Sequence, residues 1–164
     1  RNRGLELALS AHPSAQIEVQ LAYTYSSFTF VDYVVDGVQL AHRKVPGLPP
    51  HRTFASVRTY PFRSVFVGID FEVVSDYFAN DYNGPPPGSD AARAEFINGG
   101  YARVDARLGW KYAGWTVFAG LDNALDQRYN GSIVPNAAFG NRFFEPAAGR
   151  TLYVGCSWDG ILRE

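Results

Sequence analysis

The chain has 164 residues, enough for one domain with a substantial core. Its formal net charge of −1 leaves no dominant basic surface and argues against nucleic acid as a partner, and its single cysteine, Cys156, excludes an internal disulfide. No apolar run reaches the roughly 18 residues that a transmembrane helix needs. The strands of a membrane barrel alternate instead and give a much weaker hydropathy signal.

Apolar and polar residues alternate with a period of two along most of the chain, which is the pattern of β-strands. In the first such segment, Leu5, Leu7 and Leu9 share one face and Glu6 lies on the other. A strand at residues 53–60 is needed between two clearly alternating segments, but its sequence does not show which of its two faces is the apolar one. In chain order, the predicted strands are residues 4–11, 16–30, 53–60, 64–78, 101–112, 115–122 and 151–158.

The connections between these strands alternate sharply in length. Residues 12–15, 61–63 and 113–114 are short turns, whereas 27–52, 79–100 and 123–149 are long loops that all fall at the same end of the strands. Outer-membrane barrels have this layout, with short periplasmic turns and long extracellular loops. The sequence therefore predicts an all-β fold, an antiparallel up-and-down meander of about seven strands from a transmembrane β-barrel. A self-contained sandwich or small barrel that binds a ligand is the alternative.

The charged residues of the strands fall on the face opposite the aliphatic ones. Turning Arg103 or Arg107 toward lipid would cost about 2–4 kcal/mol each near the bilayer midplane, so we expect this face to line the lumen. Aromatic residues gather at both strand ends, as in the interfacial belts of membrane proteins. The predicted lumen-lining residues are Asp70, Glu72, Arg103, Asp105 and Arg107.

Four segments at these strand ends resemble motifs of one family. They are VPGLPPHR at 45–52, YARVDARLGW at 101–110, FAGLDNALDQRY at 118–129, and FFEP at 143–146 followed by GRTLYVG at 149–155. Each is weak alone, but in this order and at these strand ends they are similar to the C-terminal part of the β-barrel of TonB-dependent outer-membrane receptors. The resemblance implies a C-terminal barrel segment over residues 1–158, with 159–164 as a tail.

The resemblance also implies partners and a location. The location is the bacterial outer membrane, and the partners are outer-membrane lipid, the remaining barrel strands, an N-terminal plug domain, TonB acting through that plug, and an iron–siderophore complex or similar solute. Transporter barrels of this type have about 22 strands around a plugged lumen. Seven strands leave two edges of unpaired backbone, which lipid cannot satisfy, so we expect the chain alone not to transport.

The long loops supply the candidate ligand-binding residues. Their basic residues suit an anionic solute, and their aromatic rings could stack on one, as in other ligand pockets. The competing interpretations are a solvated basic loop and aromatic rings that pack the loops together. The candidates are Tyr33, His42, Arg43, His51, Tyr82, Phe96, Phe139 and Arg142.

Asp122, Asn123 and Asp126 are a carboxylate-rich cluster at the end of a predicted strand. Asn and Asp favour the turns that end strands, and we prefer that interpretation to a catalytic one. The residues around Cys156 include no histidine on its face, so it is expected to be a small lipid-facing side chain. The sequence predicts no enzyme, no catalytic residues, no cofactor and no metal site.

Overall fold

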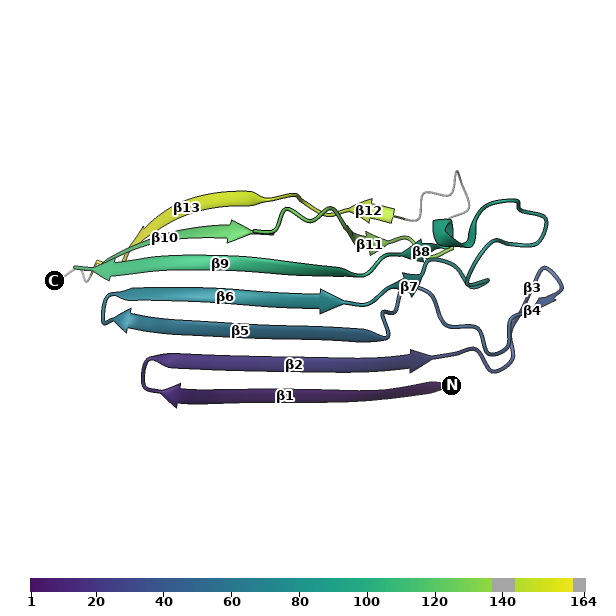
Figure 1. The fold of residues 1–164 in the computed structure, drawn as a ribbon, viewed down its shortest axis with the longest axis horizontal. Coiled ribbons are helices and arrows are strands. Elements are labelled where there is room, and N and C mark those ends of the chain that lie inside the picture. The colour runs from purple at the N-terminus through teal and green to yellow at the C-terminus, as the bar shows by residue number, and fades with distance from the viewer. Residues whose placement is uncertain (137–143, 161–164) are drawn as a thin grey trace.

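A computed structural model describes residues 1–136 and 144–160 of the chain. Its main element is one antiparallel sheet of seven strands, in which spatial order follows chain order (Figure 1). The strands are β1 (Asn2–Ser14), β2 (Ile17–Phe28), β5 (His51–Phe62), β6 (Val65–Val74), β9 (Tyr101–Tyr112), β10 (Trp115–Asp122) and β13 (Thr151–Trp158). The predicted all-β meander of seven strands is confirmed, with β1 and β13 as the edges of an open sheet.

The short turns lie together at the left of Figure 1 and the long loops at the right. The loops carry short pieces of structure that the sequence did not predict, apart from residues 77–78, which were expected at the end of the strand 64–78. These are the two-stranded sheets β3 (Val34–Val35) with β4 (Val38–Gln39), β7 (Tyr77–Phe78) with β8 (Ile97–Asn98), and β11 (Asn130–Ile133) with β12 (Phe144–Pro146), together with the 3-10 helix η1 (Arg93–Phe96). We call these loops collectively the loop layer.

The fourth predicted strand ends earlier than the alternation suggests. Ser75 ends the ladder, because its backbone N–H donates to the carbonyl of His51 at 3.0 Å while its side-chain Oγ, rather than its carbonyl, accepts from the N–H of His51 at 3.0 Å. Gly100 also crosses close to Val74, where an added Cβ would lie 2.7 Å from the Val74 carbonyl oxygen. The chain therefore leaves the main sheet after Val74 and resumes pairing as β7.

The register assigns the faces that the sequence left ambiguous in the third strand. Val57 of β5 pairs with Val19 of β2 and with Ile69 of β6, whereas Ser56 pairs with Gln20 and Asp70. The alternate residues of β5 that include Val57 therefore belong to the apolar face. One row of that face crosses six strands as Val19, Val57, Ile69, Ala106, Leu121 and Leu152.

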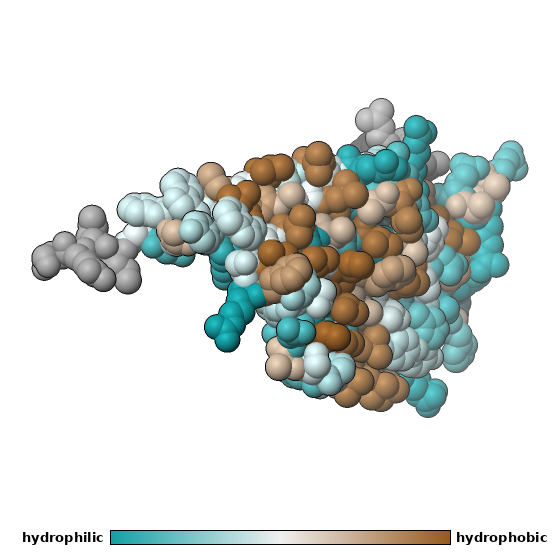
Figure 2. All heavy atoms as spheres, turned by 60° about the vertical axis from the view of Figure 1, so that its left-hand side comes forward, coloured by the Kyte–Doolittle hydropathy of each residue, from teal (hydrophilic) through white to brown (hydrophobic). Residues whose placement is uncertain are grey.

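The apolar face is exposed rather than buried. Leu9 is exposed by 60 %, Ile69 by 47 % and Leu108 by 53 %. Figure 2 shows a brown band of apolar side chains running across the strands, with teal polar residues at the loop end beside it. An exposed apolar patch of this extent marks a surface that meets an apolar environment, which for alternating strands is lipid.

Aromatic residues edge this apolar face at both ends of the strands. At the short-turn end, the rings of Trp110 and Tyr112 stack with centroids 5.5 Å apart, and those of Trp115 and Trp158 lie 6.3 Å apart. Aromatic rings with one polar tip are favoured at the two interfaces of a bilayer. The arrangement fits a sheet that crosses a membrane.

On the opposite, concave face, aromatic rings lie over glycines of neighbouring strands. Phe66, Gly109, Phe118 and Gly155 pair in one row across β6, β9, β10 and β13. A Cβ added to Gly109 would overlap the ring of Phe66, and one added to Gly155 would overlap the ring of Phe118. The glycines thus leave room for rings to lie flat where the sheet curves, which a side chain at either position would prevent.

Candidate functional site

A ladder of ion pairs joins the strands on the concave face. Glu72 of β6 holds two guanidinium groups, with Arg52 Nη2 at 2.5 Å from Oε1 and Arg103 Nη2 at 3.3 Å from Oε2. Arg103 Nε lies 3.2 Å from Asp105 Oδ2. The side chains of Glu72 and Asp105 are only 8 % exposed, so their charges are compensated almost entirely by these neighbours.

A second set of polar contacts lies one step toward the short turns. Arg107 forms an ion pair with Asp70, which also accepts a hydrogen bond from Ser56 Oγ at 2.7 Å. Arg107 Nε donates to the hydroxyl of Tyr153 at 3.4 Å. The five residues predicted to line the lumen therefore lie on one face, where they belong to two sets of polar contacts that together cross β5, β6, β9 and β13.

The carboxylate-rich segment after β10 forms a turn. Asn123 is 2 % exposed with a φ of 50°, and its side chain accepts from the N–H of Gln127 at 3.0 Å while donating to the Gln127 carbonyl at 2.9 Å. Its own N–H donates to Asp105 Oδ1 at 2.9 Å. Asp126 Oδ1 accepts from the N–H of Arg150 at 3.0 Å. These contacts are those of side chains that end a strand.

The loop layer has its own core. Phe96 is 2 % exposed and packs with the fully buried Ala79, and Ala91, Ile133 and Phe144 surround this pair. These five residues come from the second and third long loops, so the core joins segments that are distant in sequence. This core could not be predicted from the sequence, because no periodic pattern marks irregular loops.

Asparagine and aspartate side chains join the loops by hydrogen bonds. Asn83 accepts from the N–H of Lys44 at 2.6 Å and donates to the Lys44 carbonyl at 2.8 Å, which ties the second loop to the first. Asp81 Oδ2 accepts from Tyr33 Oη at 3.1 Å and from Asn136 Nδ2 at 2.9 Å. The hydrogen bond to this carboxylate raises the pKa of the Tyr33 phenol above its ordinary value.

The predicted ligand-binding residues occupy different environments. Tyr33 and Phe96 pack between loops, as described above, whereas His42 and Arg43 are exposed and Tyr82 is half-buried. Phe139 and Arg142 lie outside the described residues. The structure does not bring these residues together in one pocket, and their ligand-binding role stays a prediction.

The expected loop location of His51 is wrong. β5 begins at His51, and its pairing with Tyr25 places it on the apolar face. Its Nδ1 lies 2.8 Å from the hydroxyl of Tyr23, and its ring centroid is 5.2 Å from that of Tyr25. Because β5 begins two residues earlier than predicted, the side chain of His51 lies among the aromatic residues at the loop end of the apolar face.

Two cavities lie where the loop layer meets the concave face. One of 300 Å³ is lined in part by Arg52, Tyr77 and Tyr101, and one of 420 Å³ in part by Arg103 and Tyr129. Tyr101 lines the first of these cavities and Tyr129 the second, and their rings stack with centroids 4.1 Å apart. Tyr101 and Tyr129 were not among the site residues predicted from the sequence, because each belongs to a motif that indicated only a strand end.

Residues 1–136 and 144–160 show neither a metal-binding cluster nor a membrane-spanning helix. They contain no group of three or more His, Cys, Asp or Glu side chains placed to hold a metal ion. None of the helices in this part of the chain is long and apolar enough to span a membrane.

Comparison with known proteins supplies the family. Residues 1–124 match the family model described as TonB dependent receptor-like, beta-barrel. The chain is also similar in structure to the ferric yersiniabactin uptake receptor FyuA from Yersinia pestis, with a TM-score of 0.76 and 17 % identity over 98 % of this chain and 23 % of that one.

Two further solved structures have the same fold. The siderophore receptor PiuA from Acinetobacter baumannii gives a TM-score of 0.71 and 17 % identity over 94 % of this chain and 21 % of its own. The copper transporter OprC gives 0.66 and 16 % identity over 96 % and 22 %. At these identities the similarity shows the fold alone. The chain spans less than a quarter of the length of each of these proteins.

Proposed function

Because the chain belongs to the TonB-dependent receptor family as part of its β-barrel, we propose that it is a wall segment of a bacterial outer-membrane receptor that takes up an iron–siderophore complex or a similar scarce solute. The observation that carries the proposal is the inverted polarity of the sheet, whose aliphatic face is exposed while charged side chains pair on the concave face. Lipid on one side and an enclosed lumen on the other account for both faces.

The two edge strands of the open sheet need hydrogen-bond partners from the rest of the receptor. β1 and β13 each pair on one side only within the described residues, and lipid cannot satisfy the unpaired backbone groups. Further barrel strands of the same receptor would supply the missing pairs. We place residues 1–158 in the C-terminal part of the barrel and 159–164 as a tail, on the strength of the motif order in the sequence.

The solute would be held at the loop end of the segment. His42 and Arg43 offer exposed cationic or hydrogen-bonding groups there, and Arg52 lines a cavity beside Tyr101 at the base of the loops. These groups suit an anionic complex with flat or aromatic parts. Of the similar proteins, PiuA is named as a siderophore receptor, FyuA as a ferric yersiniabactin uptake receptor and OprC as a copper transporter. The choice of an iron–siderophore complex therefore rests on PiuA and FyuA, together with the cationic and aromatic groups at the loop end.

Uptake by the full-length receptor tests the proposed function. The gene that encodes this chain is deleted in its host, and accumulation of radioactive iron is measured under iron starvation with a panel of ferric siderophores. We expect one class of complex to lose uptake on deletion and to lose it equally when TonB is absent. Uptake of every complex at the parental rate in both strains would contradict the proposal.

A pair of matched variants locates the solute contact. In the full-length receptor, His42→Gln with Arg43→Gln is expected to raise the apparent KM for the complex, because both groups are exposed on the first loop. Arg128→Gln removes an exposed cation from the third loop and is expected to leave the KM unchanged. An equal effect of both changes would point to general loop charge rather than to a contact with the solute.

A further inference from the structure

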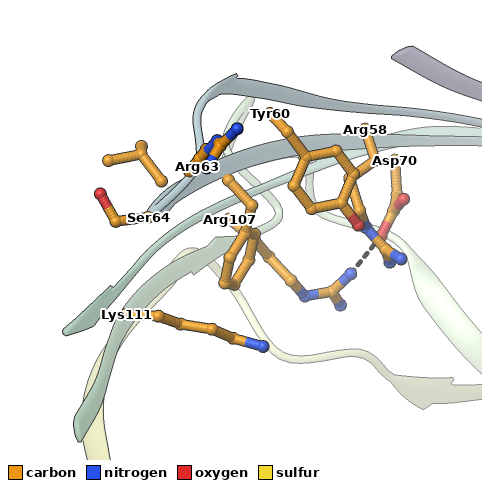
Figure 3. A pocket seen from close by; sticks show the side chains of 10 residues that line it. Arg58, Tyr60, Arg63, Ser64, Asp70, Arg107 and Lys111 are labelled. Carbon is orange, nitrogen blue, oxygen red and sulfur yellow. Dashed lines mark hydrogen bonds and ion pairs between the residues drawn. The ribbon is translucent and has the colours of Figure 1, made fainter. Parts of the chain in front are cut away.

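Cations lie on both faces of the sheet, in different surroundings. On the concave face, Figure 3 shows a hollow of 530 Å³ at the short-turn end, where Arg107 pairs with the Asp70 carboxylate. On the outward, apolar face, cations lie at the loop end of β1 and β2, next to the aliphatic residues. A cation on that side of the wall faces away from the lumen, so its partner is to be sought on the lipid side.

Strand pairing places Arg3 and Lys44 on the outward face. Arg3 of β1 pairs with Ser27 of β2, and Lys44 forms an isolated bridge with Thr29, two residues further along the same chain segment. Paired residues share a face of a sheet, as do alternate residues along a strand. Both cations therefore lie on the side of Tyr25, which belongs to the apolar face.

A cavity of 180 Å³ lies between the loop end of β2 and the segment that leads into β5. The N–H of Val45 donates to the carbonyl of Phe28 at 3.0 Å, and the N–H of Ser26 donates to the carbonyl of Pro50 at 2.9 Å. Residues 46–49 between these two hydrogen bonds do not pair with β2, which leaves the gap. We call this gap the rim cavity and define it by the lining residues Tyr25, Ser27, Lys44, Leu48 and His51.

Neighbouring residues hold the polar groups of the rim cavity in place. Asn83 accepts from the N–H of Lys44 and donates to its carbonyl, which fixes the backbone from which the ammonium group extends. His51 Nδ1 lies 2.8 Å from the hydroxyl of Tyr23. A hydroxyl that donates to Nδ1 leaves the proton of the neutral imidazole on Nε2. The cavity is then lined by an ammonium group and by an N–H donor.

The positive charge at this rim is not neutralised by carboxylates within residues 1–136 and 144–160. Neither Arg3 nor Lys44 forms an ion pair there. Asp76 lines a neighbouring cavity of 90 Å³ together with Lys44, but the two groups lie beyond ion-pair distance. The exposed cation before β13 differs, because Arg150 Nη2 lies 3.9 Å from Asp126 Oδ2. The rim beside β1 and β2 therefore suits an anionic partner.

The apolar face continues directly from the rim cavity. Leu5, Tyr25 and His51 pair in one row across β1, β2 and β5, and Leu5 is 51 % exposed. A free anion would contact the cations and leave this row uncovered, whereas a ligand with an anionic headgroup and apolar chains would contact both. That combination is the chemistry of a membrane lipid.

We propose that the rim cavity binds the headgroup phosphate of a lipid in the outer leaflet, with Lys44 and Arg3 as its cations. His51 Nε2 and the hydroxyl of Ser27 donate hydrogen bonds to the phosphate oxygens, and the acyl chains lie along Leu5. Lys44 supplies a compact point charge that suits a phosphate group. The inference rests on the proposed function, because it takes the loop end as the extracellular end of the strands.

Native mass spectrometry of the purified full-length receptor in a neutral detergent tests the site. The probe is dioleoylphosphatidic acid, which has a free phosphate monoester, and the comparison lipid is dioleoylphosphatidylcholine, whose phosphate carries a choline. We expect phosphatidic acid to bind more tightly. Lys44→Gln should raise its apparent Kd about fivefold, the contribution of one cation at an anionic lipid surface. Equal binding of the two lipids, or the parental Kd in Lys44→Gln, would overturn the proposal.

Two further variants separate the rim cavity from general surface charge. His51→Phe keeps a ring beside Tyr25 but removes the donor, and it should raise the Kd about two- to tenfold, the effect of losing one hydrogen bond to a charged group. Arg150→Gln is the matched control, because it removes an exposed cation at the same end of the sheet, and it should leave the Kd unchanged. Equal effects of Lys44→Gln and Arg150→Gln, or displacement of the lipid by equimolar inorganic phosphate, would overturn the lipid site.

Failure of this inference can be separated from failure of the proposed function. Lipid binding is measured on purified receptor without solute, whereas the proposed function is measured as TonB-dependent uptake by cells. If Lys44→Gln raised the apparent KM for the solute as much as the change at His42 and Arg43, Lys44 would contact the solute and the lipid site would be refuted. If uptake is found without a preference for phosphatidic acid, only the lipid site fails. If uptake is absent in every condition, the proposed function fails whatever the lipid binding shows.

Discussion

In the strands, Leu152 and Val154 are exposed by 73 % and 71 %, whereas in the loop layer Leu40 and Phe96 are exposed by 0 % and 2 %. The sheet therefore exposes large apolar side chains, whereas the loop layer buries some of its own. The sheet turns them outward and pairs its charges on the concave face, as a wall between lipid and a polar lumen requires. The loop layer buries them as a water-soluble protein does.

The difference follows from the solvent that each region meets. A strand surrounded by lipid gains nothing from hiding leucine, because the chains of the lipid are equally apolar. A loop in water gains roughly 1.5–3 kcal/mol for each large apolar side chain that it buries. Asn80, Asp81, Asn83 and Asn98 can lie inside the loop layer because each finds hydrogen-bond partners there. Substitutions in the full-length receptor can distinguish the two regions by experiment.

Phe96→Ala should have the largest effect, and it should be confined to the loop layer. Removing a buried phenylalanine costs about 3–5 kcal/mol, and Phe96 is the largest fully buried side chain of the core that joins two loops. Limited proteolysis should cut the loops much faster, while the strands stay protected. Val31→Ala, an exposed loop position, is the control. Equal loss of protection in strands and loops would mean that the two regions are one cooperative unit.

Ile69→Arg tests whether the exposed apolar face of the sheet contacts lipid. An arginine on the lipid face near the midplane costs about 2–4 kcal/mol, so the urea concentration needed to unfold the receptor in lipid vesicles should fall. The control, Ala22→Arg, lies on the opposite face of β2, since Ala22 pairs with Ala8 and Phe54, and should be tolerated better. If Ala22→Arg were the more damaging change, the assignment of the two faces would be reversed.

Gly109→Ala tests the packing of rings over glycines in the sheet. The added Cβ overlaps the Phe66 ring, and overpacking of this kind costs about 1–3 kcal/mol. The loss should be partly recovered by Phe66→Leu in the same molecule, which a double-mutant cycle of unfolding free energies would measure. Strictly additive effects would show that the ring and the glycine are not coupled.

Asp81→Asn should produce the smallest effect, limited to the titration of one phenol. The hydrogen bond from Tyr33 to the Asp81 carboxylate raises the pKa of Tyr33, so the neutral phenol is favoured in the folded state. This stabilisation is complete below the ordinary tyrosine pKa and is lost as the pH rises through the raised value. An ultraviolet titration, with Tyr33→Phe to identify the signal, should show the pKa falling toward its ordinary value in Asp81→Asn.

The strands and their order could be predicted from the pattern of amino acids alone. Alternation is local, and each strand shows it within its own residues. The ranges 101–112, 115–122 and 151–158 agree with β9, β10 and β13 residue for residue. The lengths of the connections gave the up-and-down topology, because a turn of two residues can join only antiparallel neighbours. Charged and aliphatic residues alternate along β6 and β9. This local pattern also predicted which residues lie on each face of the sheet.

Other features depended on contacts between residues that are far apart in the sequence. The end of β6 at Val74 depends on His51 and Gly100, and the faces of β5 depend on pairing with β2 and β6. The core around Phe96, the stack of Tyr101 on Tyr129 and the rim cavity each join separate segments. A periodic pattern indicates which face of a strand a residue lies on, but not which distant residue it contacts, because that contact exists only once the chain has folded.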